Sequence, residues 1–237
     1  MDTAPSPYTL VGYAGIDVSN HQNPKALDWN KVKQWGAVWA YIKATEGQDY
    51  SDPSSFEHAV RAQDAGVTVG YYHFARPDSI KTTPEDDAKA EAEDFLEALE
   101  ALPKGGLPPV LDWERDAPNL DKDQMASWAL TFLQTLQNAG TKTPVVYTGY
   151  YHMQETTRLD PAFTNYALWQ PWYRPGRNPW DGPPTVAEPW KTWSVYQYTD
   201  QGIIPGYDEG TLDLNVATRE FLLSTLELPD LVYRNLV

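Results

Sequence analysis

Hydrophobic residues recur along the chain in short runs, and amphipathic segments separate the first five of them. The runs at 13–19, 37–47, 67–77, 107–114 and 143–151 have the length and composition of buried strands. The segments at 27–36, 53–65, 84–102 and 121–139 place apolar residues at helical spacing. Strands that alternate with helices indicate parallel strands joined by crossover helices.

The last third of the chain has a different pattern. Runs at 166–173, 192–200 and 210–216 predict three more strands, but no good helical segment lies between them. The stretch at 174–190 is a loop rich in proline, glycine and tryptophan. The total of about eight strands predicts a closed α/β barrel whose last third is irregular.

The chain shows no internal repeat, no flexible linker and no low-complexity tail. One domain over residues 1–237 is therefore expected, with a core at about 12–220, an extension at 1–11 and a tail at 221–237. The apolar end of the tail, from 226 on, is a candidate contact surface.

Two carboxylates stand one residue apart in the stretch LPPVLDWERD, residues 107–116. Alternate residues of a strand point to the same face, so Asp112 and Glu114 are expected to face the barrel mouth together, with Trp113 turned outward under the helices. The other candidate acids at the carboxyl ends of strands are Asp17, Glu46 and Asp213. That end of a parallel barrel carries the active site. The alternative interpretation is a set of solvated strand-end acids paired with Lys43 or Arg76.

Composition and charge argue against several classes of function and of catalytic site. The net charge of −15 argues against a nucleic-acid partner, and no apolar run is long enough for a membrane span. There is no cysteine, the four histidines lack paired ligand spacing, and no GxSxG motif is present. Carboxylates suit Mg²⁺ or Ca²⁺, but nothing in the spacing demands a metal, so neither metal nor cofactor is expected. Two-carboxylate chemistry remains, for which glycoside hydrolysis is the standard case.

Six motifs in order resemble those of the glycoside hydrolase family 25 lysozymes over roughly residues 12–220. They are GIDVSNHQ (15–22), YIKATEG (41–47), VGYYHFARP (69–77), PPVLDWE (108–114), PVVYTGY (144–150) and YQYTDQGIIPGYDEGTLDLN (196–215). The resemblance implies an irregular TIM-like barrel of five β/α units followed by three strands with few or no helices. It also implies cleavage of the β-1,4 bond between N-acetylmuramic acid and N-acetylglucosamine in peptidoglycan.

The resemblance also implies a role for each matching residue. Glu114 matches the general acid, Asp112 the carboxylate that assists through the 2-acetamido group, and Asp17 and Asp213 the remaining catalytic acids. The matching substrate-binding residues are Tyr41, Glu46, Tyr72, Tyr147, Trp169 and Gln197. Core packing is the competing interpretation of the aromatic residues.

The chain departs from the usual family pattern in its last third. Tyr196 stands where a tryptophan often precedes the QYT motif, and QPWYRP follows Trp169. We expect the loop at 174–190, with Arg174 and Arg177, to border the lactyl ether and peptide of muramic acid.

Peptidoglycan is the expected partner, and a monomer without a separate wall-binding domain is expected to act on the cell wall. The start of the chain has no basic or apolar region of a signal peptide. This pattern is typical both of a phage endolysin and of a mature secreted enzyme. A catalytically silent sugar-binding barrel is the alternative to an enzyme.

Overall fold

The computed structural model describes residues 14–78, 82–176 and 178–225. The predicted extension at 1–11, the tail from 226 on and Arg177 lie outside the described residues. The strands are β1 (Ala14–Val18), β2 (Trp39–Glu46), β3 (Tyr50–Ser51), β4 (Thr68–Phe74), β5 (Val110–Asp112), β6 (Val145–Tyr147), β7 (Ala167–Pro171), β8 (Val195–Gly202) and β9 (Leu212–Ala217). The helices are α2 (Trp29–Trp35), α3 (Ser55–Asp64), α4 (Pro84–Ala101), α5 (Lys122–Asn138), α6 (Tyr150–Thr156) and α7 (Arg219–Thr225), with 3₁₀ turns η1 (Pro161–Asn165) and η2 (Pro179–Asp181).

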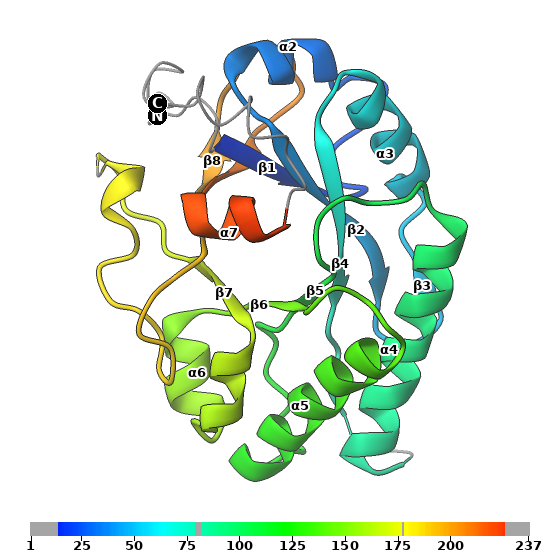
Figure 1. Ribbon diagram of the computed structural model, residues 1–237, viewed down its shortest axis with the longest axis vertical. Helices are drawn as coiled ribbons and strands as arrows, with labels where there is room; N and C mark the ends of the chain where they lie inside the picture. Colours follow the sequence, from blue (N-terminus) through cyan, green and yellow to red (C-terminus); the bar gives the residue numbers. More distant parts are fainter. Residues whose placement is uncertain (1–13, 79–81, 177, 226–237) are drawn as a thin grey trace.

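Eight of these strands close into a barrel. The order is β1-β9-β8-β7-β6-β5-β4-β2, and β1 also pairs with β2, which completes the ring. The two-residue β3 forms a short antiparallel pair with the end of β2. Helices α3, α4, α5 and α6 lie around the outside of the ring (Figure 1). The predicted irregular TIM-like α/β barrel is confirmed.

The last strand runs against its neighbours. β9 is antiparallel to both β1 and β8, whereas all other neighbouring pairs in the ring are parallel. The prediction that Asp213 lies at the carboxyl end of a strand is therefore wrong, because Asp213 is the second residue of β9. The reversal nevertheless brings this amino end to the rim where the other strands end, and Asp213 stands opposite Asp17.

The strand that carries the acid pair is shorter than predicted. β5 ends at Asp112, so Glu114 lies two residues beyond it. The chain still follows β6, because the Trp113 N–H donates to the Tyr147 carbonyl at 2.8 Å. The Trp113 side chain is fully buried and packs on His152 of α6 and Phe163 of η1, with ring centroids 5.2 and 5.4 Å away. The outward orientation expected for Trp113 is confirmed.

Two helices differ from the predicted pattern. The predicted fifth strand reached residue 151, but the chain leaves β6 at Tyr147 and α6 begins at Tyr150. This short helix completes the fifth β/α unit. Helix α7 occupies 219–225, most of it in the segment predicted as tail, and buries Phe221 and Leu222.

Helix α7 closes the barrel at the end away from the acids. Because β9 runs in reverse, its carboxyl end and α7 reach the rim where the other strands begin. Phe221 and Leu222 join the side chains inside the barrel, a cluster that includes Trp39, Tyr41, Val110 and Trp169. A second and larger cluster fills the space between the barrel and its helices. The inner cluster is therefore a packed floor beneath the open rim.

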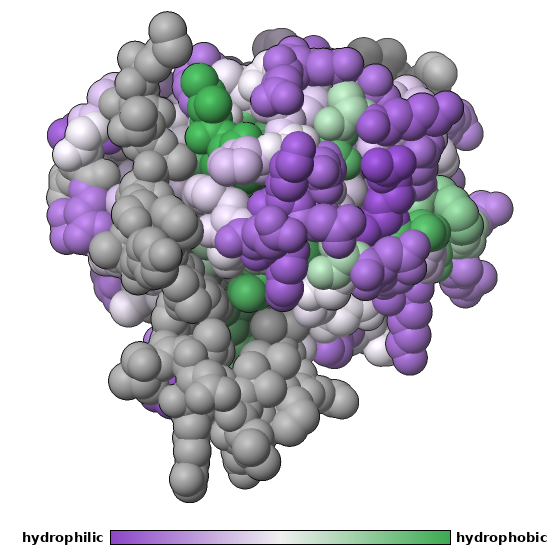
Figure 2. Space-filling model, turned by 90° about the horizontal axis from the view of Figure 1, so that it is seen from above, coloured by the Kyte–Doolittle hydropathy of each residue, from purple (hydrophilic) through white to green (hydrophobic). Residues whose placement is uncertain are grey.

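The described residues on one face of the protein are mostly polar. At the end that carries α2, hydrophilic side chains predominate among the residues that are coloured by hydropathy, and hydrophobic ones are scattered among them (Figure 2). No helix within the described ranges has both the length and the apolar character needed to cross a lipid bilayer.

Gly15 in β1 gives a test of this packing. A Cβ there would lie 2.3 Å from the ring of Trp39, on the neighbouring strand β2, and neither group can move without opening the barrel. We expect Gly15→Ala to lower the free energy of unfolding by about 1–3 kcal/mol, measured by urea denaturation. Gly210→Ala is the matched control, since its nearest contact is 3.6 Å. Equal stability of the two variants would contradict the inner packing described here.

Candidate active site

The four predicted catalytic acids meet in one cavity of about 300 Å³ at the rim of the barrel. Asp17 comes from β1, Asp112 from the end of β5, Glu114 from the loop after it, and Asp213 from β9. Four of the predicted substrate-binding residues also line the cavity: Tyr72, Tyr147, Trp169 and Gln197.

Tyr41 and Glu46 do not line the cavity. Tyr41 has no solvent exposure and stacks on Trp169 inside the barrel, with ring centroids 5.0 Å apart. It supports the cavity floor, so the core-packing interpretation holds for this residue. Glu46 instead forms ion pairs with Lys43 and Arg76.

Asp17 is the best-supported carboxylate of the cluster. Its Oδ2 atom accepts hydrogen bonds from Gln197 Nε2 at 2.9 Å and from Asn215 Nδ2 at 2.7 Å. Burial raises the pKa of Asp17, and these two amide donors oppose that effect by favouring the charged form. Trp169 Nε1 donates in turn to Asn215 Oδ1 at 2.9 Å, which fixes the amide orientation.

The surroundings of Asp213 favour its protonated form. Burial, together with the charge of Asp17 and a hydrogen bond to it, raises the pKa of Asp213 to about 9. Because like charges this close do not easily ionise together, the raised pKa of Asp213 favours a proton on this member of the pair.

Asp112 and Glu114 differ in their surroundings. Burial raises the pKa of Asp112 well above its usual range, and its Oδ1 is buried with no hydrogen-bond partner among the described residues. Glu114 is an exposed residue at the mouth. Desolvation of its carboxyl and the charge of Asp17 raise its pKa, while Tyr147 and Lys43 lower it. Burial and the charges of Glu114 and Asp17 thus act against the ionised form of Asp112 in the free protein.

Lys43 supplies a positive charge inside the cavity. From the sequence, Lys43 was expected only as a possible partner of solvated acids at the strand ends. Its side chain lines the cavity, the residue is 7% exposed, and its Nζ lies 4.8 Å from the centroid of the Phe74 ring. Burial lowers the pKa of Lys43, and the charges of Asp112, Asp52 and Glu114 oppose this shift. The same cation lowers the pKa of both Asp112 and Glu114.

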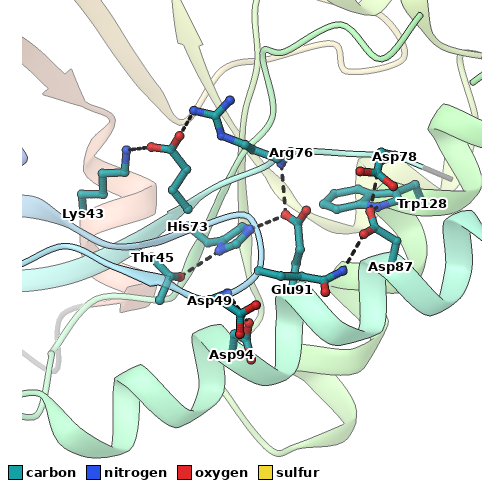
Figure 3. Close-up of polar contacts among 12 residues, drawn as sticks. Lys43, Thr45, Asp49, His73, Arg76, Asp78, Asp87, Glu91, Asp94 and Trp128 are labelled. Carbon is teal, nitrogen blue, oxygen red and sulfur yellow. Dashed lines mark hydrogen bonds and ion pairs between the residues drawn. The ribbon is translucent and has the colours of Figure 1, made fainter. Parts of the chain in front are cut away.

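A chain of polar contacts holds Lys43 from behind (Figure 3). Lys43 pairs with Glu46, and Glu46 pairs with Arg76 in the loop after β4. The backbone N–H of Arg76 donates to Glu91 of α4 at 3.0 Å. The position of the cation therefore depends on how α4 packs on the barrel.

The far end of this chain is fully buried. Glu91 Oε2 lies 2.7 Å from His73 Nε2, and His73 Nδ1 lies 2.8 Å from the Thr45 hydroxyl. Burial lowers the pKa of His73 to about 3 and raises that of Glu91 to about 8. A neutral imidazole has one N–H that donates and one nitrogen that accepts, so His73 can form hydrogen bonds with both Glu91 and Thr45.

Sequence reasoning missed several other cavity residues, among them Ser19, His21, Gln22, Phe74, Tyr173 and Asp200. Tyr173 matters most for the network, since its hydroxyl donates to Gln197 Oε1 at 2.6 Å, beside the 2.8 Å bond from Tyr147. Lys43 and Asp200 stand inside motifs quoted above, and Tyr173 stands in the unusual QPWYRP stretch. Within the described residues, no group of three or more histidine, aspartate and glutamate side chains is arranged to hold a metal ion.

Several known proteins to which the chain is similar carry the name lysozyme or muramidase. The chain is 31% identical over 223 residues to lysozyme M1 of Streptomyces globisporus, covering 88% of this chain and 69% of that protein. It is 28% identical over 161 residues to the N,O-diacetylmuramidase of a Chalaropsis species, covering 64% and 72% of the two chains. Among solved structures, the bacterial lysozyme from Streptomyces coelicolor superposes with a TM-score of 0.75 at 29% identity, over 90% of this chain and 96% of that one.

Residues 16–207 match the family model described as glycosyl hydrolases family 25. That match spans most of the chain, so the protein belongs to glycosyl hydrolase family 25.

Proposed function

We propose that this protein is a lysozyme that hydrolyses the β-1,4 bond between N-acetylmuramic acid and N-acetylglucosamine in the peptidoglycan of bacterial cell walls. The observation that carries the proposal is the placement of Asp112 and Glu114 in one cavity with the Asp17–Asp213 pair and aromatic walls. The family and the relatives named lysozyme and muramidase support the same activity. The predicted monomeric state and single-domain organisation stay predictions.

Glu114 is the proposed general acid. It lies at the exposed mouth, where the glycosidic oxygen of a polymer can reach it, and its raised pKa favours the protonated form that a general acid needs. As the bond from the anomeric carbon to that oxygen breaks, Glu114 donates its proton to the departing oxygen. It then takes a proton from the water that completes hydrolysis.

Asp112 is the proposed partner of the 2-acetamido group. A hydrogen bond from the acetamido N–H favours a charged carboxylate and so lowers the pKa of Asp112. Substrate binding thereby favours the ionised form of Asp112, and a charged Asp112 nearby favours the proton on Glu114. The acetamido oxygen, oriented by Asp112, attacks the anomeric carbon, and water later opens the resulting ring with retention of configuration.

Asp17 is the proposed stabiliser of the positive charge that develops on the sugar ring. Its two amide donors hold the carboxylate in one position before the substrate arrives. A charge fixed in advance needs no reorganisation during the reaction, and it favours the charged transition state over the neutral substrate.

The product of digestion tests which bond is cut. Peptidoglycan alternates two sugars, and a muramidase leaves muramic acid at each new reducing end. We expect digestion of purified peptidoglycan, borohydride reduction and sugar analysis to give muramicitol and essentially no glucosaminitol. Glucosaminitol alone would identify a glucosaminidase, and binding without any new reducing end would identify a silent sugar-binding barrel.

The acid pair gives a second prediction. Glu114→Gln removes the donated proton while keeping the shape of the side chain, so we expect kcat to fall by about 10²–10⁴ with sugar binding retained. Asp112→Asn is expected to lower kcat with little change in affinity, since its help is given mainly in the transition state. Steady-state rates on soluble glycan fragments, together with circular dichroism to check folding, provide the measurement. Near-normal turnover by Glu114→Gln would falsify the assignment.

The role of Lys43 gives a third prediction, on pH dependence. Its cation lowers the pKa of Glu114, so removing the charge raises that pKa and moves the alkaline limb of kcat/KM to higher pH. We expect a shift of about one unit in Lys43→Met and an unmoved limb in Lys43→Arg, which keeps the charge.

The pH at which the alkaline limb of kcat/KM falls does not depend on the amount of folded protein. A less stable variant can therefore still be measured. Lys31→Met on α2 is the matched control, because Lys31 is exposed and pairs only with Asp28 at 3.6 Å among the described residues. An alkaline limb at the same pH in Lys43→Met and the wild type would remove Lys43 from the control of the acid pair.

A further inference from the structure

Three aromatic side chains form a cluster on the rim outside the cavity. Tyr150 and Tyr151 open helix α6, and Trp172 directly follows β7. Their ring centroids lie 5.3 Å apart for the two tyrosines, and 5.6 and 5.8 Å from Trp172 to Tyr150 and Tyr151. Tyr151 is 63% exposed, the largest exposure among the large hydrophobic residues described. We call Tyr150, Tyr151, Trp172 and Arg174 the outer platform.

The platform continues the wall of the cavity. Tyr147, which lines the cavity, precedes Tyr150 by three residues, and Tyr173, which also lines it, follows Trp172. Helix α6 lies beside the end of β7 in the ribbon view (Figure 1). A chain bound in the cavity that leaves it over Tyr147 and Tyr173 therefore meets these rings next.

The backbone of the platform is fixed. The Trp172 N–H donates to the Gln197 carbonyl at 3.0 Å, and the Tyr196 hydroxyl donates to the Trp172 carbonyl at 2.7 Å. Gln197 also binds Asp17, so the segment that carries Trp172 is tied to the strand that orients the catalytic cluster. Rigid aromatic side chains on a fixed backbone lose little entropy when they bind a ligand.

A positive charge accompanies the rings. The Arg174 guanidinium lies 5.4 Å from the centroid of the Trp172 ring, and Arg174 forms no ion pair with another described residue. In a protein of net charge −15, a cation without an acidic partner next to an acidic cavity favours an anionic group on the ligand.

We propose that the outer platform binds a sugar residue of the glycan strand beyond the cleaved disaccharide, with the ring face on Tyr151 and Trp172 and the acidic peptide stem at Arg174. This rests on the proposed function, since it names where the same substrate continues. A glycan strand is longer than a cavity of about 300 Å³, so it must cross the rim. Tyrosine and tryptophan suit this surface because they combine an apolar face for the sugar C–H groups with a polar tip in water.

The test compares long and short substrates. For wild type, Tyr151→Ala and Trp172→Ala, kcat/KM is measured on long glycan strands and on the shortest soluble fragment that is cleaved. We expect the ratio of the long-strand value to the short-fragment value to fall about tenfold in each variant, through KM. Phe56→Ala on α3 is the matched control, as Phe56 is 58% exposed and does not line the cavity. An unchanged ratio in both platform variants, or an equal loss on both substrates, would overturn the proposal.

The charge is tested separately with Arg174→Gln. Its loss of kcat/KM is expected on strands that keep their peptide stems and not on strands stripped of stems by an amidase. Equal behaviour on both would remove Arg174 from the platform.

Failure of the proposed function can be told apart from failure of the platform. If the wild type cleaves neither substrate, the proposed activity is wrong, and sedimentation with insoluble peptidoglycan still compares Tyr151→Ala with Phe56→Ala. Weaker sedimentation of Tyr151→Ala alone supports the platform, and equal sedimentation contradicts it.

Discussion

The antiparallel pairing of β9 with β1 is the interaction on which the rest of the structure depends. It closes the ring of eight strands, and it places Asp213 directly opposite Asp17. The same reversal sends the chain to the far rim, where α7 covers the inner cluster with Phe221 and Leu222. One change of strand direction thus brings Asp17 and Asp213 together at one end of the barrel and closes the other end.

Gathering four acids in one cavity has a cost, because like charges repel and burial disfavours ions. The structure offsets it in three ways. Amide donors hold the charge of Asp17, the surroundings of Asp213 favour its protonated form, and Lys43 provides a cation. Lys43 pairs with Glu46, Glu46 pairs with Arg76, and the backbone of Arg76 binds Glu91 on α4. The charge distribution in the cavity therefore depends on how α4 packs against the outside of the barrel.

The aromatic residues divide into two functions according to depth. Tyr41 and Trp169 stack inside the barrel and support the floor of the cavity. Tyr150, Tyr151 and Trp172 stand on the rim, where Tyr151 is exposed and the other two are half-buried against the core beneath them. The excess of aromatic residues in the composition therefore has two physical causes, filling a wide barrel and presenting flat surfaces at its mouth.

The sequence by itself determined the first four β/α rounds, the fifth strand, the three later strands and the acids of the rim, because hydrophobic periodicity and strand-end motifs are local signals. It did not determine the direction of β9, the helix after β6 or the partners of Glu46, since these follow from contacts between distant segments. The roles of Tyr41 and Lys43 were decided only by the tertiary structure. Whether a tyrosine in a strand faces the interior floor or the cavity, and whether a lysine pairs at the surface or inside the site, depends on how deeply the closed barrel buries each position.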